Sequence, residues 1–171
     1  MVKTHILGFP RIGAKRELKR AVESYWKQEI DLPQLEQTTK QIRLRNWQRQ
    51  IEAGLDFITV GDFSLYDQVL DMSSLLGVVP ERFGSCPDQV DADLYFRMAR
   101  GRAPTGEDNH ACEMTKWFDT NYHYLVPEIK SNQTFKLSCE RLFDEIEEAR
   151  QLERAIKPVI IGPLTYLWLS K

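Results

Sequence analysis

The segment Asp56-Phe-Ile-Thr-Val-Gly61 is a compact apolar run bounded by turn residues. It predicts a short β-strand that delivers Asp62 just beyond its C-terminal end. Lys157-Pro-Val-Ile-Ile-Gly-Pro163 is almost continuous in β-branched residues, which is typical of a strand buried on both faces of a parallel sheet. Two more strands are predicted, a buried one from Thr4 to Phe9 and one from Met114 to Leu125 that is rich in aromatic and β-branched residues.

Helical patterns lie between these strands. The predicted helices cover residues 15–30, residues 31–54 with Asp31 as N-cap, residues 65–76, and a segment that begins at Ser138 as N-cap. Residues 78–108 are richer in Pro, Gly and Asp and are expected to be irregular, apart from a helical patch around residues 94–99. The alternation of strands and helices predicts βαβ crossovers and an α/β fold with a parallel sheet.

The predicted α/β units are about four in number. A closed (βα)8 barrel of the TIM type takes roughly 250 residues. Residues 1–171 therefore amount to roughly half of such a barrel, which predicts one truncated domain. No helix is predicted to cover the fourth strand, so the chain is expected to be a piece of a longer protein.

Composition excludes several classes of function. Lys plus Arg number 23 and Asp plus Glu number 25, and this balance argues against binding nucleic acid or an anionic membrane through a general field. No run approaches the ~18 apolar residues of a membrane span, so we expect a cytoplasmic protein. Cys86, Cys112 and Cys139 are widely spaced, which predicts neither a disulfide framework nor a metal site, and His110-x-Cys112 is interpreted as a chance pairing.

The densest basic feature is RIGAKRELKR, residues 11–20, in which five cations accompany one acid, Glu17. It follows the first predicted strand and opens the first predicted helix, a position where backbone N–H groups favour anions. The segment is a candidate site for an acidic ligand, although charge runs on helices are more often only surface. The alternative is a solvated helix surface in which Lys19 pairs with Glu23.

A second candidate contact is Lys116, within EMTKWFDTNYHY. Trp117 and Tyr122 nearby either stack on a planar ligand or pack into the core. Asp62 and Asn121 are candidates only as polar residues at strand ends. GRAPTGE, residues 101–107, lacks the spacing of a phosphate loop, and no nucleophilic or protease-like arrangement is present, so no catalytic residue is predicted in this chain.

Five longer blocks carry a resemblance. They are LGFPRIGAKRELKRAVESYW (7–26), VGDFSLYDQVL (60–70), RGRAPTGE (100–107), EMTKWFDTNYHYLVPE (113–128) and KPVIIGPLTYLWLSK (157–171). In this order they resemble the opening of the cobalamin-independent methionine synthases, and the similarity runs from end to end.

The resemblance implies two (βα)8 barrels, and it makes this chain the first half of the N-terminal one. It implies transfer of the N5 methyl group of 5-methyltetrahydrofolate triglutamate to homocysteine, with zinc and without cobalamin. The family's folate contacts fall on Arg16, Glu17, Leu18, Lys19 and Lys116. Its zinc and homocysteine ligands belong to the C-terminal barrel, so the resemblance implies no metal ligand here.

The same resemblance sets expectations for the isolated piece. We expect it to be inactive, to bind folate polyglutamate weakly at most, and to self-associate through uncovered apolar strands, whereas the full-length enzyme is expected to be a monomer. One alternative is a non-catalytic polyanion-binding or interaction module. Another is a relative with the same barrel that acts on a different acidic small molecule.

Overall fold

The structure is a computed structural model that describes residues 2–84 and 88–171. Cys86 lies outside the described residues. The chain divides into two compact units, and each is described by itself. The first unit comprises Met1–Leu65 and Arg141–Ile160, and the second comprises Tyr66–Glu140 and Ile161–Lys171.

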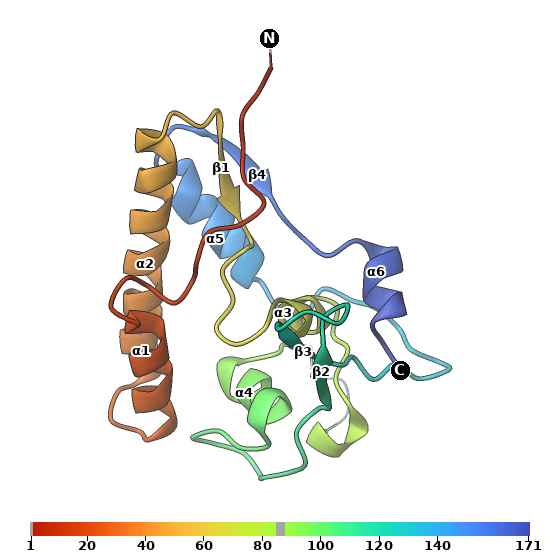
Figure 1. Cartoon of the computed structure of the whole chain (residues 1–171). Coiled ribbons are helices and arrows are strands. Elements are labelled where there is room, and N and C mark those ends of the chain that lie inside the picture. Colours follow the sequence, from red (N-terminus) through yellow and green to blue (C-terminus); the bar gives the residue numbers. More distant parts are fainter. Residues whose placement is uncertain (1, 85–87) are drawn as a thin grey trace. The chain divides into compact units, whose positions relative to one another are not determined.

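The first unit contains a parallel pair of strands covered by helices. Its elements are α1 (Glu17–Trp26), α2 (Leu32–Glu52), β1 (Phe57–Val60), α5 (Arg141–Arg150) and β4 (Ala155–Pro158). β1 pairs with β4 in a register that runs from Phe57 opposite Ala155 to Val60 opposite Pro158. α5 contacts both strands, as Figure 1 shows. Trp47, Ile58, Val60 and Ala149 form the buried core between strands and helices.

Local signals explain the two N-terminal helices, and both predictions are confirmed. α1 buries Leu18, Ala21, Val22 and Tyr25 along one stripe. α2 begins with a capping box in which the Asp31 carboxylate accepts from the Gln34 N–H at 2.9 Å and the Gln34 side chain accepts from the Asp31 N–H at 2.9 Å.

Two side chains of α2 attach the helix to β1. Trp47 Nε1 donates to the Thr59 carbonyl at 2.8 Å, and Gln50 Oε1 accepts from the Thr59 N–H at 2.9 Å. The buried backbone of Thr59 thus finds both of its partners on the helix.

The second unit is built around a hairpin. Its elements are α3 (Gln68–Leu75), the 3-10 helix η1 (Glu81–Phe83), α4 (Ala92–Arg100), β2 (Met114–Lys116), β3 (His123–Leu125) and α6 (Pro163–Trp168). β2 and β3 pair in antiparallel fashion, and β3 contacts α3. The core of this unit comprises Val69, Val78, Tyr124, Val126, Tyr166 and Leu169. α4 confirms the helical patch predicted inside the irregular stretch.

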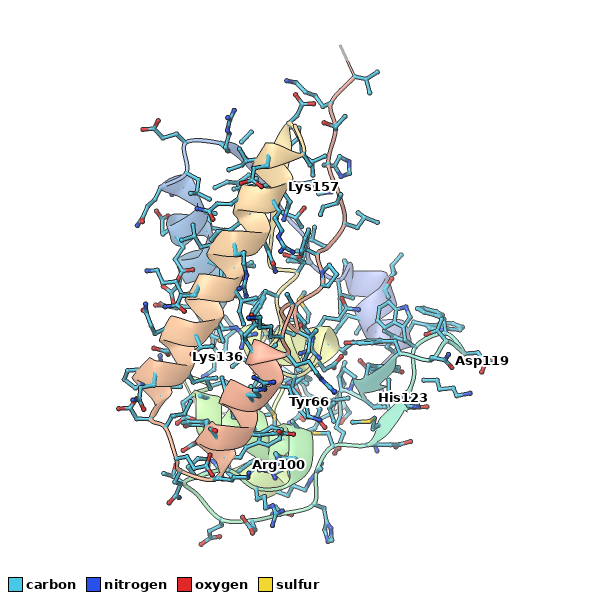
Figure 2. All side chains as sticks on the ribbon, turned by 60° about the vertical axis from the view of Figure 1, so that its left-hand side comes forward. Tyr66, Arg100, Asp119, His123, Lys136 and Lys157 are labelled. Carbon is cyan, nitrogen blue, oxygen red and sulfur yellow. The ribbon has the colours of Figure 1, made fainter. Side chains whose placement is uncertain are left out.

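The prediction of a buried strand from Thr4 to Phe9 is wrong. The segment runs beside β1 (Figure 1), but it is mostly exposed and forms no ladder. The Thr4 carbonyl accepts from the N–H groups of Asp56 and Phe57. Further along the segment the partners are side chains: the Thr59 hydroxyl donates to the Ile6 carbonyl at 2.9 Å. Lys157 of β4, labelled in Figure 2, also donates to Ile6 at 3.2 Å.

The prediction of one strand from Met114 to Leu125 is also wrong, because the segment folds back on itself. Phe118 and Asp119 at the turn have φ of 43° and 59°. Two successive positive φ values are the geometry of a tight hairpin turn, which usually selects Asn-Gly. The absence of glycine conceals this turn in the sequence.

Two predicted boundaries near the C-terminus need correction as well. The helix expected from Ser138 begins at Arg141, and the Ser138 N–H donates to the Leu75 carbonyl at 3.0 Å instead of capping a helix. β4 begins at Ala155 and is half-exposed, because β1 is its one strand partner among the described residues. The short helix α6 then follows where none was predicted.

The mixed α/β class is confirmed, with one parallel and one antiparallel pair of strands in the described residues. The half-barrel over residues 1–171 stays a prediction.

Among the helices of residues 2–84 and 88–171, none combines the length and the apolarity that crossing a bilayer requires.

Candidate functional site

The basic segment that follows Phe9 is anchored to the loop after β1. The Asp62 carboxylate accepts from the Phe9 N–H at 2.7 Å, and Arg11 Nη1 donates to the Ser64 carbonyl at 3.2 Å. Burial raises the pKa of Asp62, and the hydrogen bond from Phe9 opposes this rise. Asp62 therefore positions the segment from the end of β1, and its role as a ligand contact stays a prediction.

A tight turn leads from this anchor into α1. The Arg16 N–H donates to the Gly13 carbonyl at 3.1 Å, and Gly13 has φ of +81°. Glycine suits this positive φ, and a Cβ at Gly13 would displace the Glu17 carboxylate from its present position. Arg16, the residue before the helix, is itself left-handed, with φ 60° and ψ 36°, and its side chain makes no capping hydrogen bond.

Glu17 is used inside the protein. Its Oε2 accepts from the Lys15 N–H at 2.7 Å, and its Oε1 accepts from Arg45 Nη2 of α2 at 3.0 Å. The pKa of the Glu17 carboxyl is lowered, first by backbone N–H groups of Glu17 and Lys15 and then by the Arg45 guanidinium. Both oxygens are engaged in holding the turn, so Glu17 organises this segment.

The remaining residues of the predicted contact set differ in exposure. Leu18 is 1% exposed and belongs to the core. Arg16 is exposed at the start of the helix. Lys19 Nζ lies 3.6 Å from Glu23, and both side chains are about half exposed, so the surface pair proposed as the alternative exists. Arg16 and Lys19 are therefore the members of the set that present positive charge to solvent.

Lys116 lies on β2 in the second unit. Its side chain is 54% exposed and its Nζ is 3.7 Å from Asp119, which is almost completely exposed. Figure 2 shows Asp119 and His123 on the outside of the hairpin. The Trp117 ring meets Phe118, Tyr122 and Tyr124 edge-on, with centroids 5.2, 6.4 and 6.0 Å away. Trp117 also packs against the core, which favours the packing interpretation for this residue.

The structure thus brings Arg16, Glu17, Leu18 and Lys19 together in the first unit and holds Lys116 in the second. Their union around one ligand stays a prediction.

Sequence reasoning missed Asp67, which is 1% exposed. Its Oδ2 accepts from the N–H groups of Leu70 at 3.0 Å and Leu125 at 3.1 Å, and its Oδ1 accepts from the Tyr122 hydroxyl at 2.5 Å. Burial raises the pKa of Asp67, against the effect of these donors. An Asp three residues before Leu70 was a usable N-cap signal, but the helix was predicted to begin at Leu65.

Among the residues that the structure describes, the possible donors do not fit a zinc centre. Burial raises the pKa of the Cys112 thiol to about 11, whereas a zinc ligand must be a thiolate. The neighbouring Arg82 forms a two-pronged ion pair with Glu128, at 2.6 and 2.8 Å, and so occupies that carboxylate. Within the described residues, no three His, Cys, Asp or Glu side chains are gathered as metal ligands would be.

The Arg45→Met variant is expected to raise the pKa of Glu17 only part of the way back to its ordinary value of 4.5, because the backbone donors are the larger causes and stay. The interactions of ionised Glu17 stabilise the fold above that value and are lost as pH falls through the lowered pKa. NMR titration of the Glu17 carboxyl measures the shift. Arg49→Met, an exposed arginine of the same helix, should leave it unchanged. If the pKa of Glu17 returned completely to 4.5 in Arg45→Met, the backbone donors would not be the larger cause of its lowering.

The fold and the exposed Arg16 and Lys19 define the class of protein: it is a mixed α/β domain with a basic surface that follows its N-terminal extended segment. Comparison with known proteins makes the assignment specific. The sequence matches the family described as cobalamin-independent synthase, N-terminal domain, over residues 3–171, and the chain belongs to this family. The resemblance to cobalamin-independent methionine synthases is thereby confirmed.

Three curated relatives carry the name 5-methyltetrahydropteroyltriglutamate–homocysteine methyltransferase. The protein from Nitrosomonas europaea is 58% identical over 168 residues, that from Photorhabdus laumondii is 54% identical over 167, and that from Yersinia pestis is 53% identical over 170. These alignments cover 98–99% of this chain and 22% of each relative. The chain therefore spans about a fifth of the length of the relatives it matches.

Proposed function

We propose that the complete protein transfers the methyl group of 5-methyltetrahydropteroyltriglutamate to homocysteine, and that this chain binds part of the triglutamate tail. The observation that carries the proposal is the identity of 53–58% with methyltransferases of that name along nearly the whole chain. In this proposal Arg16, Lys19 and Lys116 supply the positive charge.

The chemistry of the tail supports this role for Arg16. Several carboxylates follow one another along a glutamate chain, and a guanidinium binds a carboxylate through two parallel hydrogen bonds. Arg16 stands immediately before α1, where the helix dipole favours an anion. An exposed arginine held by a tight turn at that point is suited to an acidic ligand.

The two lysines fit the same ligand for a different reason. Lys19 and Lys116 are paired with Glu23 and Asp119 on the surface, and such exposed pairs contribute little to stability. A ligand carboxylate therefore exchanges with them at small cost. Glu17 and Leu18 enter the proposed site as residues that hold its backbone, because their side chains are occupied inside the first unit.

The methyl transfer itself lies outside this chain in our proposal. In the complete enzyme, zinc would bind the homocysteine thiol and keep it deprotonated, as the nucleophile. The resemblance assigns the zinc ligands to the C-terminal barrel, and the described residues gather no such ligands, so we propose that the isolated chain does not catalyse the reaction. Its residues contribute binding and orientation of the methyl donor.

Glutamate length tests the proposal in the full-length protein. In the Arg16→Ala and Lys116→Ala variants, affinity for the triglutamate folate should fall about tenfold, because each loses one hydrogen bond between charged groups. Affinity for the monoglutamate should change less than twofold. Calorimetric titration with both forms measures the difference.

Lys27→Ala removes the same charge from the exposed C-cap of α1 and serves as the control. It should leave both affinities unchanged. An equal loss for the two folate forms, or the same loss in Lys27→Ala, would favour the alternative of a polyanion-binding module that does not recognise glutamate length.

A further inference from the structure

The hairpin that carries Lys116 is too short to be stable by itself. β2 and β3 share three residue pairs, in which Lys116 stands opposite His123. An isolated two-stranded hairpin is marginal in water even with longer strands. Its placement therefore depends on attachments outside the ladder.

The turn adds a cost that the attachments must offset. Phe118 and Asp119 are both left-handed, although neither is glycine or asparagine. A bulky residue in this region is unusual, and such backbone persists only where the surroundings over-determine it. The turn is closed by the Thr120 N–H and hydroxyl, which both donate to the Trp117 carbonyl, at 2.9 and 2.6 Å.

The attachment next to Lys116 is the hydroxyl of Tyr122. Trp117 directly follows Lys116, and its N–H donates to the Tyr122 carbonyl at 2.8 Å. The Tyr122 hydroxyl in turn donates to Asp67 Oδ1 at 2.5 Å. Asp67 Oδ2 holds the other end of β3 through the Leu125 N–H at 3.1 Å. One carboxylate thus binds the last residue of β3 and Tyr122, the residue just before β3.

Asp67 is itself held firmly. Besides capping α3 through Leu70, it receives support from α4, where the Tyr95 hydroxyl lies 3.2 Å from the Asp67 N–H and 3.0 Å from the Tyr66 N–H. Both Asp67 and Tyr95 are at most 3% exposed. The carboxylate is a fixed point of the second unit, while Tyr122 reaches it from the partly exposed hairpin.

We infer that Asp67 and Tyr122 are positioning residues for Lys116, which they hold in place for an acidic ligand through the hydrogen bond from the Tyr122 hydroxyl to the Asp67 carboxylate. The inference rests on the proposed function, since it assigns to Lys116 the triglutamate tail. Neither residue needs to touch the ligand. Their effect on binding passes through the backbone beside Lys116.

The test uses Tyr122→Phe in the full-length protein, because it removes the hydroxyl that donates to Asp67 and accepts from the Gln68 N–H at 3.4 Å, and leaves the Asp67 cap on the Leu70 N–H in place. Tyr124→Phe is the matched control, since it removes a hydroxyl two residues further along the hairpin, in β3, that donates to the Leu169 carbonyl at 3.0 Å. Two measurements are made: hydrogen exchange of the peptide 114–125, and affinity for triglutamate and monoglutamate folate. We expect Tyr122→Phe to speed exchange and to weaken triglutamate binding about fivefold, with a smaller effect on the monoglutamate.

Combining Tyr122→Phe with Lys116→Ala decides whether Tyr122 acts through Lys116. If it does, the double variant loses no more triglutamate affinity than Lys116→Ala alone. Additive losses, equal losses in Tyr122→Phe and Tyr124→Phe, or unchanged triglutamate affinity in Tyr122→Phe would each overturn the inference. Failure of the proposed function gives a different result. The unmodified protein would then bind triglutamate and monoglutamate folate equally, at any rate of hydrogen exchange in the hairpin.

Discussion

Asp67→Ala is expected to lower the free energy of unfolding by about 3 kcal/mol, since hydrogen bonds to a charged partner contribute about 1.5–3 kcal/mol each and an N-cap about 1 kcal/mol, without full additivity. The variant leaves the Leu70 and Leu125 N–H groups and the Tyr122 hydroxyl without their acceptor. Because Asp67 is 1% exposed, water does not readily replace the carboxylate. Denaturant unfolding of the chain, followed by circular dichroism, measures the loss.

Asp91→Ala is the matched control for Asp67→Ala. Asp91 also caps a helix, with its Oδ1 accepting from the Leu94 N–H at 2.7 Å, but it is exposed. Its replacement should cost about 1 kcal/mol, the usual effect of losing an N-cap. Equal losses in the two variants would mean that the hairpin attachments of Asp67 contribute nothing to stability.

Arg43→Ala is expected to destabilise the first unit by about 3 kcal/mol, the usual result of removing one partner from a buried ion pair. The Arg43 guanidinium is bound to both oxygens of Glu148 at 2.8–3.0 Å and lies 3.8 Å from Glu145, which is 2% exposed. It also stacks on the Phe63 ring at 5.4 Å. The alanine variant leaves two carboxylates of α5 without this positive charge. Chemical denaturation at neutral pH provides the measurement.

An exposed ion pair on α5, the helix that carries Glu145 and Glu148, is the control for Arg43→Ala. Arg150 contacts Glu147 with both side chains about two-thirds exposed, so Arg150→Ala should change stability by less than about 0.5 kcal/mol. A cost in Arg43→Ala as small as that of Arg150→Ala would show that the Arg43 ion pair is screened by solvent despite its burial.

Elements with local signals were predicted well. The capping pair of Asp31 and Gln34, the apolar stripe of α1 and the compact run of β1 depend on residues close in sequence, and all three elements are where they were expected. The hairpin was missed because Phe118-Asp119 lacks the glycine that announces such a turn. The segment from Thr4 to Phe9 was misread because its partners are side chains about fifty residues away, such as Asp56 and Asp62.

The candidate site shows the same division. The cations of residues 11–20 and Lys116 were visible as a pattern, whereas the role of Glu17 was not, because its partner Arg45 lies 28 residues further along the chain. Asp67 was overlooked because an aspartate in sequence carries no sign of its burial. Its importance comes from donors that belong to α3 and to the hairpin.

Family membership, the helices α1 and α2 with the Asp31 cap, and the positions of the basic residues follow from the order of amino acids alone, since each depends on local pattern or on similarity along the chain. Tertiary structure decided which charges are engaged and which are exposed. Glu17 is engaged, Arg16 is exposed, and Asp67 fixes the strand opposite Lys116. The physical reason is that burial and long-range hydrogen bonds exist only once distant segments have been brought together, and these determine what each side chain does.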